Sequence, residues 1–250
     1  MNYLFGLNPV LEALRARPET IERLYLAEGA LSPKVAGELL SRASDRRIRV
    51  DRVDRERLSR LAEGGVHQGV VAEARDFEYR ELEELIALAA EGPRAPLLVL
   101  LDGIQDPHNL GAIIRSAHAL GAQGVVLMKD RAASVTPAVV KASAGAALHT
   151  AVARVTNLSR AIEALKKAGY WTCALDPQGS QTPWEVDLAG PLAVVVGAEG
   201  EGVRKGVLGH CDFRLRIPMQ GQVDSLNASV SAGVLLYEIA RQRHAAPISP

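Results

Sequence analysis

Short apolar runs alternate with longer segments of helical periodicity in the carboxy-terminal part of the chain. The runs LLVLL and LAVVV lack polar alternation, which is typical of strands buried on both faces of a sheet. We predict strands at residues 97–101, 124–128, 151–155, 170–174, 192–196 and 213–217, and helices at residues 110–120, 137–142, 158–167, 203–208 and 226–241. This alternation predicts a parallel sheet covered by helices.

The first 75 residues show a second, shorter α/β pattern. We expect strands at residues 21–26, 48–53 and 66–74, with helices starting near Asn8, Pro33 and Asp54. Residues 76–95 are acidic and end in GPRAP, which indicates an inter-domain linker with one helical piece. The sequence therefore predicts an α/β protein with a small domain at 1–75, a linker at 76–95 and a parallel-sheet domain at 96–250.

Composition and charge narrow the class of protein. The 250 residues are 48% hydrophobic with a formal net charge of zero, which counts mildly against nucleic-acid binding but allows a local basic patch. The two cysteines, Cys173 and Cys211, lack metal-ligand spacing and indicate a reducing compartment. The sequence contains no signal-peptide pattern and no apolar run near the roughly 20 residues of a membrane helix. We expect a cytoplasmic protein with neither a metal site nor a membrane partner.

A polar loop and a helix follow the first strand of the larger domain. The segment LDGIQDPHNLGAIIRSAHALGA, residues 101–122, lacks the G-x-G-x-x-G pattern of dinucleotide-binding folds. We expect Asn109 to cap the helix, and the small residues around Arg115 leave its guanidinium accessible. A helix cap and a surface arginine explain both positions as well as a functional role does.

A glycine-containing turn follows the strand at residues 192–196. Its sequence is GAEGEG, and the glycines allow backbone N–H groups to approach a ligand closely. Glu199 is held among these glycines at the carboxyl end of a strand, where ligands bind in open α/β sheets. The turn therefore predicts a binding site, although the dinucleotide fingerprint is absent.

The last regular stretch is FRLRIPMQGQVDSLNASVSAGVLLYEIAR, residues 213–241. Pro218 and Gly221 end its strand, and we expect Asp224 or Ser225 to cap the helix that follows. Polar residues at this helix start lie beside free backbone N–H groups, which favour polar or anionic ligands. The apolar surplus in the second half of the helix predicts either an interface or packing on the chain's own sheet.

Together, these three segments resemble the motifs of the SpoU (TrmH) family of SPOUT RNA 2′-O-methyltransferases. The resemblance rests on Asn109 with Arg115, on GAEGEG at residues 197–202, and on IPM followed by SLN at residues 217–219 and 225–227. The segments GLNPVLEAL and GVHQGV resemble the family's substrate-binding domain, so nearly the whole chain is covered. The chain is most similar to the members that methylate a guanosine ribose in bacterial 23S rRNA.

The resemblance implies a fold, a cofactor and a set of site residues. The larger domain would contain a deep trefoil knot, and the small domain would adopt a ribosomal-protein-like RNA-binding fold of the L30e type. The cofactor S-adenosylmethionine would contact Gly197, Ile217, Met219 and Leu226. The catalytic candidates would be Arg115, Asn109, Glu199, Ser225 and Asn227. The family works as a homodimer with its active site near the interface.

We therefore expect methyl transfer from S-adenosylmethionine to a ribose 2′-hydroxyl of RNA, with a guanosine of 23S rRNA as the favoured target. A tRNA ribose methyltransferase and a non-catalytic rRNA-binding assembly factor are the alternatives. Residues 41–60 hold eight arginines and four acids, which a solvated surface or a phosphate-binding face would explain. The RNA-binding candidates are Arg42, Arg46, Arg47 and Arg49. The pKa of arginine exceeds about 12, so an arginine rarely acts as a base. We therefore expect Arg115 to bind a phosphate or to stabilise the developing alkoxide.

Overall fold

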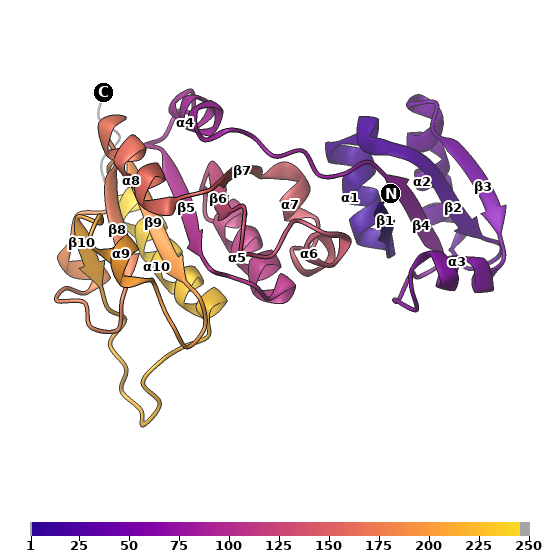
Figure 1. Cartoon of the computed structure of the whole chain (residues 1–250). Helices are drawn as coiled ribbons and strands as arrows, with labels where there is room; N and C mark the ends of the chain where they lie inside the picture. Colours follow the sequence, from indigo (N-terminus) through magenta and orange to yellow (C-terminus); the bar gives the residue numbers. More distant parts are fainter. Residues whose placement is uncertain (1, 246–250) are drawn as a thin grey trace. The chain divides into compact units, whose positions relative to one another are not determined.

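A computed structural model of the chain describes residues 2–245, which pack as two compact units (Figure 1). Unit 1 comprises Met1–Glu78 and Ser134–His149, and unit 2 comprises Tyr79–Ala133 and Thr150–Pro250. Each unit contains one sheet with helices. In the described part of the chain, no helix has the length and apolar character needed to cross a membrane.

Unit 2 is built on a sheet whose six described strands all run parallel to their neighbours. In spatial order the strands are β10 (Phe213–Leu215), β8 (Trp171–Leu175), β9 (Leu192–Gly197), β5 (Leu97–Asp102), β6 (Gly124–Met128) and β7 (Ala151–Val155). The central strands β5 and β9 pair along their whole length, and all their residues are buried. The parallel sheet expected from the apolar runs is confirmed.

The helices of unit 2 separate its strands along the chain. They are α4 (Leu82–Ala90), α5 (Pro107–Ala119), α8 (Leu158–Lys167), α9 (Lys205–Leu208) and α10 (Ala228–Ala245), with a short 3-10 helix η2 (Pro183–Glu185). Leu82, Leu85 and Ala89 of α4 are buried in the core of this unit. The helical piece expected in the acidic linker therefore belongs to the core of unit 2.

Helix α5 begins earlier than the sequence prediction. It starts at Pro107 rather than at residue 110, because Asp106 is its cap. The Asp106 carboxylate accepts hydrogen bonds from the backbone N–H groups of His108 and Asn109, at 3.1 and 3.2 Å. The capping role predicted for Asn109 was wrong, and its side-chain amide is left available for other partners.

Helix α10 begins later than expected. It starts at Ala228, and Asn227 is the residue whose side chain accepts the backbone N–H of Ser229 at 2.9 Å. The capping role predicted for Asp224 or Ser225 was wrong. An asparagine carboxamide accepts a backbone N–H as well as an aspartate does and still has an N–H₂ group to donate. Asn227 can therefore cap α10 with its side-chain oxygen and still donate a hydrogen bond from its side-chain N–H₂ group.

Unit 1 contains a four-stranded sheet in the order β1-β4-β2-β3 among its described residues. Its strands are β1 (Asn2–Phe5), β2 (Ile21–Ala27), β3 (Arg49–Val53) and β4 (Val70–Ala74), and its helices include η1 (Pro18–Thr20), α1 (Leu7–Ala16), α2 (Pro33–Asp45) and α3 (Arg55–Leu61). Strand β1 pairs antiparallel with β4 and was not expected, because four residues give too short a pattern.

Two helices from the middle of the chain also pack in unit 1. They are α6 (Pro137–Ala142) and α7 (Ala146–His149). The Arg17 guanidinium donates a hydrogen bond to the Leu148 carbonyl at 2.9 Å, and His149 Nε2 lies 3.0 Å from Glu12 Oε2. These contacts join α7 to the first helix of the chain.

Candidate active site

The loop after β9 is a tight turn that lines two cavities of unit 2. The Gly202 N–H donates a hydrogen bond to the Ala198 carbonyl at 2.9 Å, and Gly200 and Gly202 have φ values of 80° and 66°. A Cβ atom at Gly197 would lie only 2.0 Å from the backbone of Gly202. Glycine is therefore required at Gly197, because any side chain there would push the turn open.

Cavity A lies at the carboxyl ends of β8, β9 and β10 and has a volume of about 140 Å³. Its described lining is Leu175, Asp176, Pro177, Val196, Gly197, Ala198, Glu199, Gly200, Gly202, Leu215, Ile217, Met219, Asp224, Ser225, Leu226, Ala228 and Ser231. This lining includes the four residues expected to contact the cofactor. Ligands of open α/β sheets bind at such strand ends, so cavity A is the candidate cofactor site.

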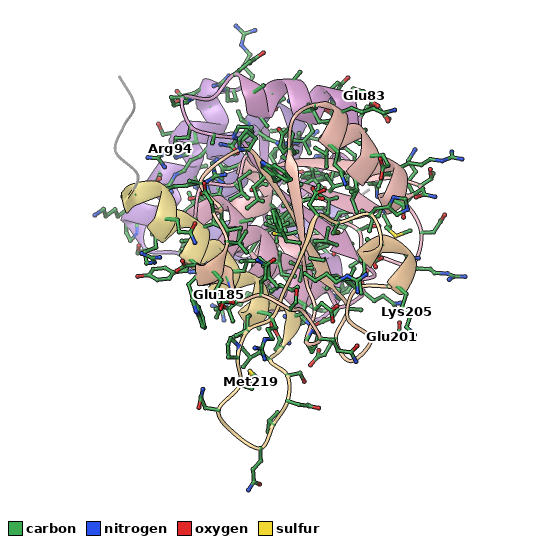
Figure 2. The ribbon with its side chains drawn as sticks, turned by 90° about the vertical axis from the view of Figure 1, so that its left-hand side faces the viewer. Glu83, Arg94, Glu185, Glu201, Lys205 and Met219 are labelled. Carbon is green, nitrogen blue, oxygen red and sulfur yellow. The ribbon has the colours of Figure 1, made fainter. Side chains whose placement is uncertain are left out.

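The walls of cavity A suit a ligand with both apolar and polar parts. Ile217, Met219 and Leu226 offer apolar surface, while the glycine turn offers backbone N–H and C=O groups. Figure 2 shows the loop between β10 and α10 extending from the unit, with Met219 near its base. Asp176 adds a carboxylate that can accept hydrogen bonds from ribose hydroxyls or an amino group.

A chain of hydrogen bonds connects three of the five catalytic candidates. The Asn227 amide donates to Asn109 Oδ1 at 2.9 Å, and the Asn109 amide donates to Glu199 Oε2 at 3.4 Å. Ser229 Oγ donates to Asn227 Oδ1 at 2.6 Å. The structure thus joins residues that are 90 and 118 positions apart in the sequence. The network orients the Glu199 carboxylate at the border of the two cavities.

Cavity B lies on the other side of the glycine turn and has a volume of about 330 Å³. Its described lining is Asp102, Gly103, Ile104, Gln105, Asp106, Asn109, Met128, Arg131, Ala198, Glu199, Glu201, Gly202 and Arg204. Glu199 is the one acidic residue among those described that lines both cavities. A group bound in cavity B therefore lies next to a ligand in cavity A.

An ion pair that the sequence reading missed supports the floor of cavity B. The side chain of Asp102 at the end of β5 is fully buried, and Arg204 lies 2.6 Å from it. Asp102 also accepts the backbone N–H of Arg204 at 2.9 Å, so it holds the end of the glycine turn. The sequence signal that could have revealed this ion pair is an aspartate directly after a fully apolar strand. A carboxylate buried at such a position needs a charged or hydrogen-bonding partner.

The other candidates lie outside the hydrogen-bond network of the described residues. Ser225 is exposed and lines cavity A. Arg115 is exposed on α5, and the residues described around either cavity do not include it. The four RNA-binding candidates lie in unit 1, from the end of α2 to β3: Arg42, Arg46, Arg47 and Arg49.

Helix α10, whose first turn contributes to cavity A, is anchored at its other end by polar contacts. The Gln242 amide donates to the carbonyls of Pro183 and Val186 at 3.1 and 3.2 Å. Hydrogen bonds from Arg241 lower the pKa of Glu238 to about 2, so this carboxylate stays ionised. The Gln242 hydrogen bonds hold α10 against the segment that contains η2, while the Glu238–Arg241 pair lies within α10 itself.

Comparisons with known proteins agree with the geometry. The SpoU rRNA Methylase family model matches residues 96–237, and the model for RNA 2′-O ribose methyltransferase substrate binding matches residues 3–80. The chain is 44% identical over 243 residues to the 23S rRNA (guanosine-2′-O-)-methyltransferase RlmB of Pseudomonas aeruginosa, covering 96% of each chain. It is 41% identical over 243 residues to the putative TrmH family tRNA/rRNA methyltransferase YacO of Bacillus subtilis, covering 97% of this chain and 96% of that protein.

A solved structure gives the same result. The SpoU methyltransferase AviRb from Streptomyces viridochromogenes, crystallised with AdoMet, superposes with a TM-score of 0.80 and 28% sequence identity. The match covers 98% of this chain and 91% of that one. The resemblance inferred from the three motifs is therefore confirmed, and the chain belongs to the SpoU rRNA methylase family.

Proposed function

We propose that this protein transfers a methyl group from S-adenosylmethionine to the ribose 2′-hydroxyl of a guanosine in 23S rRNA. The observation that carries the proposal is the hydrogen-bond network from Asn227 through Asn109 to Glu199, at the border of two cavities. The 44% identity to a named 23S rRNA guanosine methyltransferase supports the choice of RNA and nucleotide. A cytoplasmic location follows from this substrate.

S-adenosylmethionine fits the residues that line cavity A. The apolar side chains of Ile217, Met219 and Leu226 would pack against its adenine, and the backbone of the glycine turn would bond its polar groups. Gly197 keeps the turn closed around this space. When bound, the cofactor supplies a methyl group that a nucleophile can attack.

The chain's own residues must orient the nucleophile and stabilise the charge that develops on it. A ribose hydroxyl is a weak nucleophile that loses its proton during attack. Glu199 borders both cavities and would accept a hydrogen bond from this hydroxyl, while Asn109 holds the carboxylate in place. Ser225, at the edge of cavity A, would hydrogen-bond the substrate. Arg115 would bind the target phosphate or the developing alkoxide.

A homodimer forms part of this proposal, and α10 supports it. Leu235, Leu236 and Ile239 are fully buried within the chain, so they need no partner. Val230, Val234 and Tyr237 are 50%, 42% and 64% exposed and recur at helical spacing. An exposed apolar stripe of this kind favours a second copy of the chain as its partner. Because α10 packs against α5, this interface would lie close to the helix that carries Arg115.

Family membership also extends the proposal to the finer features of the fold. These are a deep trefoil knot in a methyltransferase domain at residues 96–250, an L30e-type RNA-binding domain at residues 1–75, and a linker at residues 76–95 whose helix α4 packs in the core of unit 2. The loops after β8, β9 and β10 line cavity A together, and these are the loops that such a knot would bring to the cofactor. The substrate-binding model over residues 3–80 supports an RNA-binding role for the first domain.

The RNA-binding arginines differ in how free they are. Arg42 lies 3.0 Å from Glu38, and Arg49 lies 3.0 Å from Asp51, so both are partly neutralised. Arg46 and Arg47 are exposed at the end of α2. We therefore assign the stronger phosphate contacts to Arg46 and Arg47 and weaker ones to Arg42 and Arg49.

Ribose methylation mapping in a strain without this protein tests the proposal. We expect the loss of one 2′-O-methylguanosine in 23S rRNA, restored by the parent protein but not by its Glu199→Ala variant. Loss of a tRNA mark would instead identify a tRNA methyltransferase. If every mark is retained while ribosome assembly is impaired, the protein is an rRNA-binding assembly factor.

A further inference from the structure

Cavity B has the size and position of a substrate subsite. Its volume of about 330 Å³ is more than twice the 140 Å³ of cavity A. It shares Ala198, Glu199 and Gly202 with the candidate cofactor cavity. A nucleotide whose ribose lies at this shared wall would therefore have its base available to the rest of cavity B.

Three of the four acidic residues in cavity B already have partners. Asp102 is paired with Arg204, Asp106 caps α5, and Glu199 accepts the Asn109 amide. Within the described residues, Glu201 has neither a hydrogen bond nor an ion pair from its side chain, and it is exposed (Figure 2). Glu201 is therefore the carboxylate in this cavity that is left to accept hydrogen bonds from a ligand.

The remaining polar side chains on the cavity rim add donors. Arg131 and Gln105 are both exposed and both line cavity B. This combination of a free carboxylate, a guanidinium and an amide is absent from the described walls of cavity A, which offer carboxylates but no guanidinium and no side-chain amide. Such a set matches a ligand that presents neighbouring donors and neighbouring acceptors.

Guanine is the nucleobase with that arrangement. Its N1–H and N2 amino groups are adjacent donors, which one carboxylate can accept in parallel, and its O6 and N7 are acceptors for a guanidinium. Adenine would direct its N1 lone pair at the carboxylate, which is unfavourable. Enzymes that select a base commonly read its Watson–Crick edge once it is unstacked from its neighbours.

We propose that cavity B holds the target guanine and that Glu201 determines specificity by accepting hydrogen bonds from its N1–H and N2 amino groups. Arg131 donates to the acceptor side of the same base. This inference rests on the proposed function, because it assumes that an RNA guanosine is the substrate. Glu201 reads the base and takes no part in the chemistry at the ribose.

Single-turnover methylation of two matched RNAs tests the role of Glu201. One RNA carries guanosine at the target position, and the other carries inosine, which lacks only the N2 amino group. We expect the parent enzyme to methylate the inosine RNA roughly ten- to hundredfold more slowly, as for a lost hydrogen bond to a charged group. In Glu201→Ala the ratio of the guanosine rate to the inosine rate should fall close to one, because the guanine N2 amino group then has no partner.

Two further variants complete the experiment. Glu201→Gln retains an acceptor oxygen without the charge, so its ratio should be intermediate. Glu84→Ala removes another exposed carboxylate of unit 2, on α4, and should keep the parent's ratio. Equal melting temperatures for all variants show that folding is unchanged.

The outcomes separate the two proposals. If the parent methylates the guanosine RNA but Glu201→Ala retains the parent's discrimination against inosine, the assignment of Glu201 is wrong and the proposed activity stands. If the parent methylates no guanosine in ribosomal RNA, the proposed function fails, and the assignment of Glu201 fails with it.

Discussion

The two cavities that border the glycine turn differ in the side chains that line them. Both cavities are lined by carboxylates as well as apolar residues, but among the described residues guanidinium and side-chain amide groups line only cavity B. Both share Glu199 and the turn that follows β9. In our proposal, the backbone of the turn therefore contributes more to binding in cavity A, and charged and amide side chains contribute more in cavity B.

This difference has a physical reason. A turn whose glycines lie within contact distance of one another excludes side chains, so cavity A can recognise a ligand through its fit to the backbone. A nucleotide has few distinguishing features apart from its hydrogen-bonding edge and its phosphate, so a site for it needs polar side chains. Substitutions on the two sides should consequently affect different measurements.

The largest effect is expected from Arg115→Ala on α5, which lines neither cavity among the described residues and which we assign to the RNA phosphate or the developing alkoxide. Loss of a positioned charge at a developing oxyanion costs about 2.7–4 kcal/mol, which corresponds to a roughly hundred- to thousandfold lower single-turnover rate. Cofactor affinity, measured by calorimetry, should remain unchanged. Arg160→Ala, at another exposed helical arginine of unit 2, is the control. A rate for Arg115→Ala within about threefold of the parent would show that Arg115 is an ordinary surface residue.

A smaller effect is expected on the cofactor side, from Gly197→Ala. The added methyl group would lie 2.0 Å from the backbone of Gly202, so the turn must shift. Overpacking of this kind costs about 1–3 kcal/mol, and we expect cofactor affinity to fall roughly 5- to 150-fold. Gly206→Ala is the matched control, because a Cβ atom there has no heavy atom within 4 Å. Equal cofactor affinity in both variants would contradict the role of the turn in shaping cavity A.

The smallest effect is expected from the double variant Arg46→Glu/Arg47→Glu in unit 1. RNA affinity should fall and its dependence on salt should flatten by about one unit of slope for each lost phosphate contact. Cofactor affinity should not change. Arg60→Glu, on α3 and already 2.7 Å from Glu56, makes half of this charge change outside the cluster, so it should leave the salt slope unchanged. An unchanged salt slope in the double variant would leave these arginines as part of a solvated surface.

The strands of unit 2 and the three motif segments, at residues 109–115, 197–202 and 217–227, could be predicted because each is recognised from a few neighbouring residues. An uninterrupted apolar run such as residues 97–101 predicts a buried strand wherever it lies in the chain. The starts of α5 and α10 could not be predicted correctly, because several cap-forming residues lie within a few positions of each other. Asp106 took the cap of α5 in place of Asn109, and Asn227 took that of α10 in place of Ser225.

The sequence by itself determined the fold class, the three motifs and, through their resemblance, the family. Only the tertiary structure decided that Asn109, Glu199 and Asn227 share one hydrogen-bond network, and that Asp102 holds Arg204 beneath a second cavity. The reason is distance along the chain. Backbone propensity and periodicity act over a few residues, whereas a hydrogen bond between side chains 90 or 118 positions apart depends on how the parallel strands are ordered in the sheet.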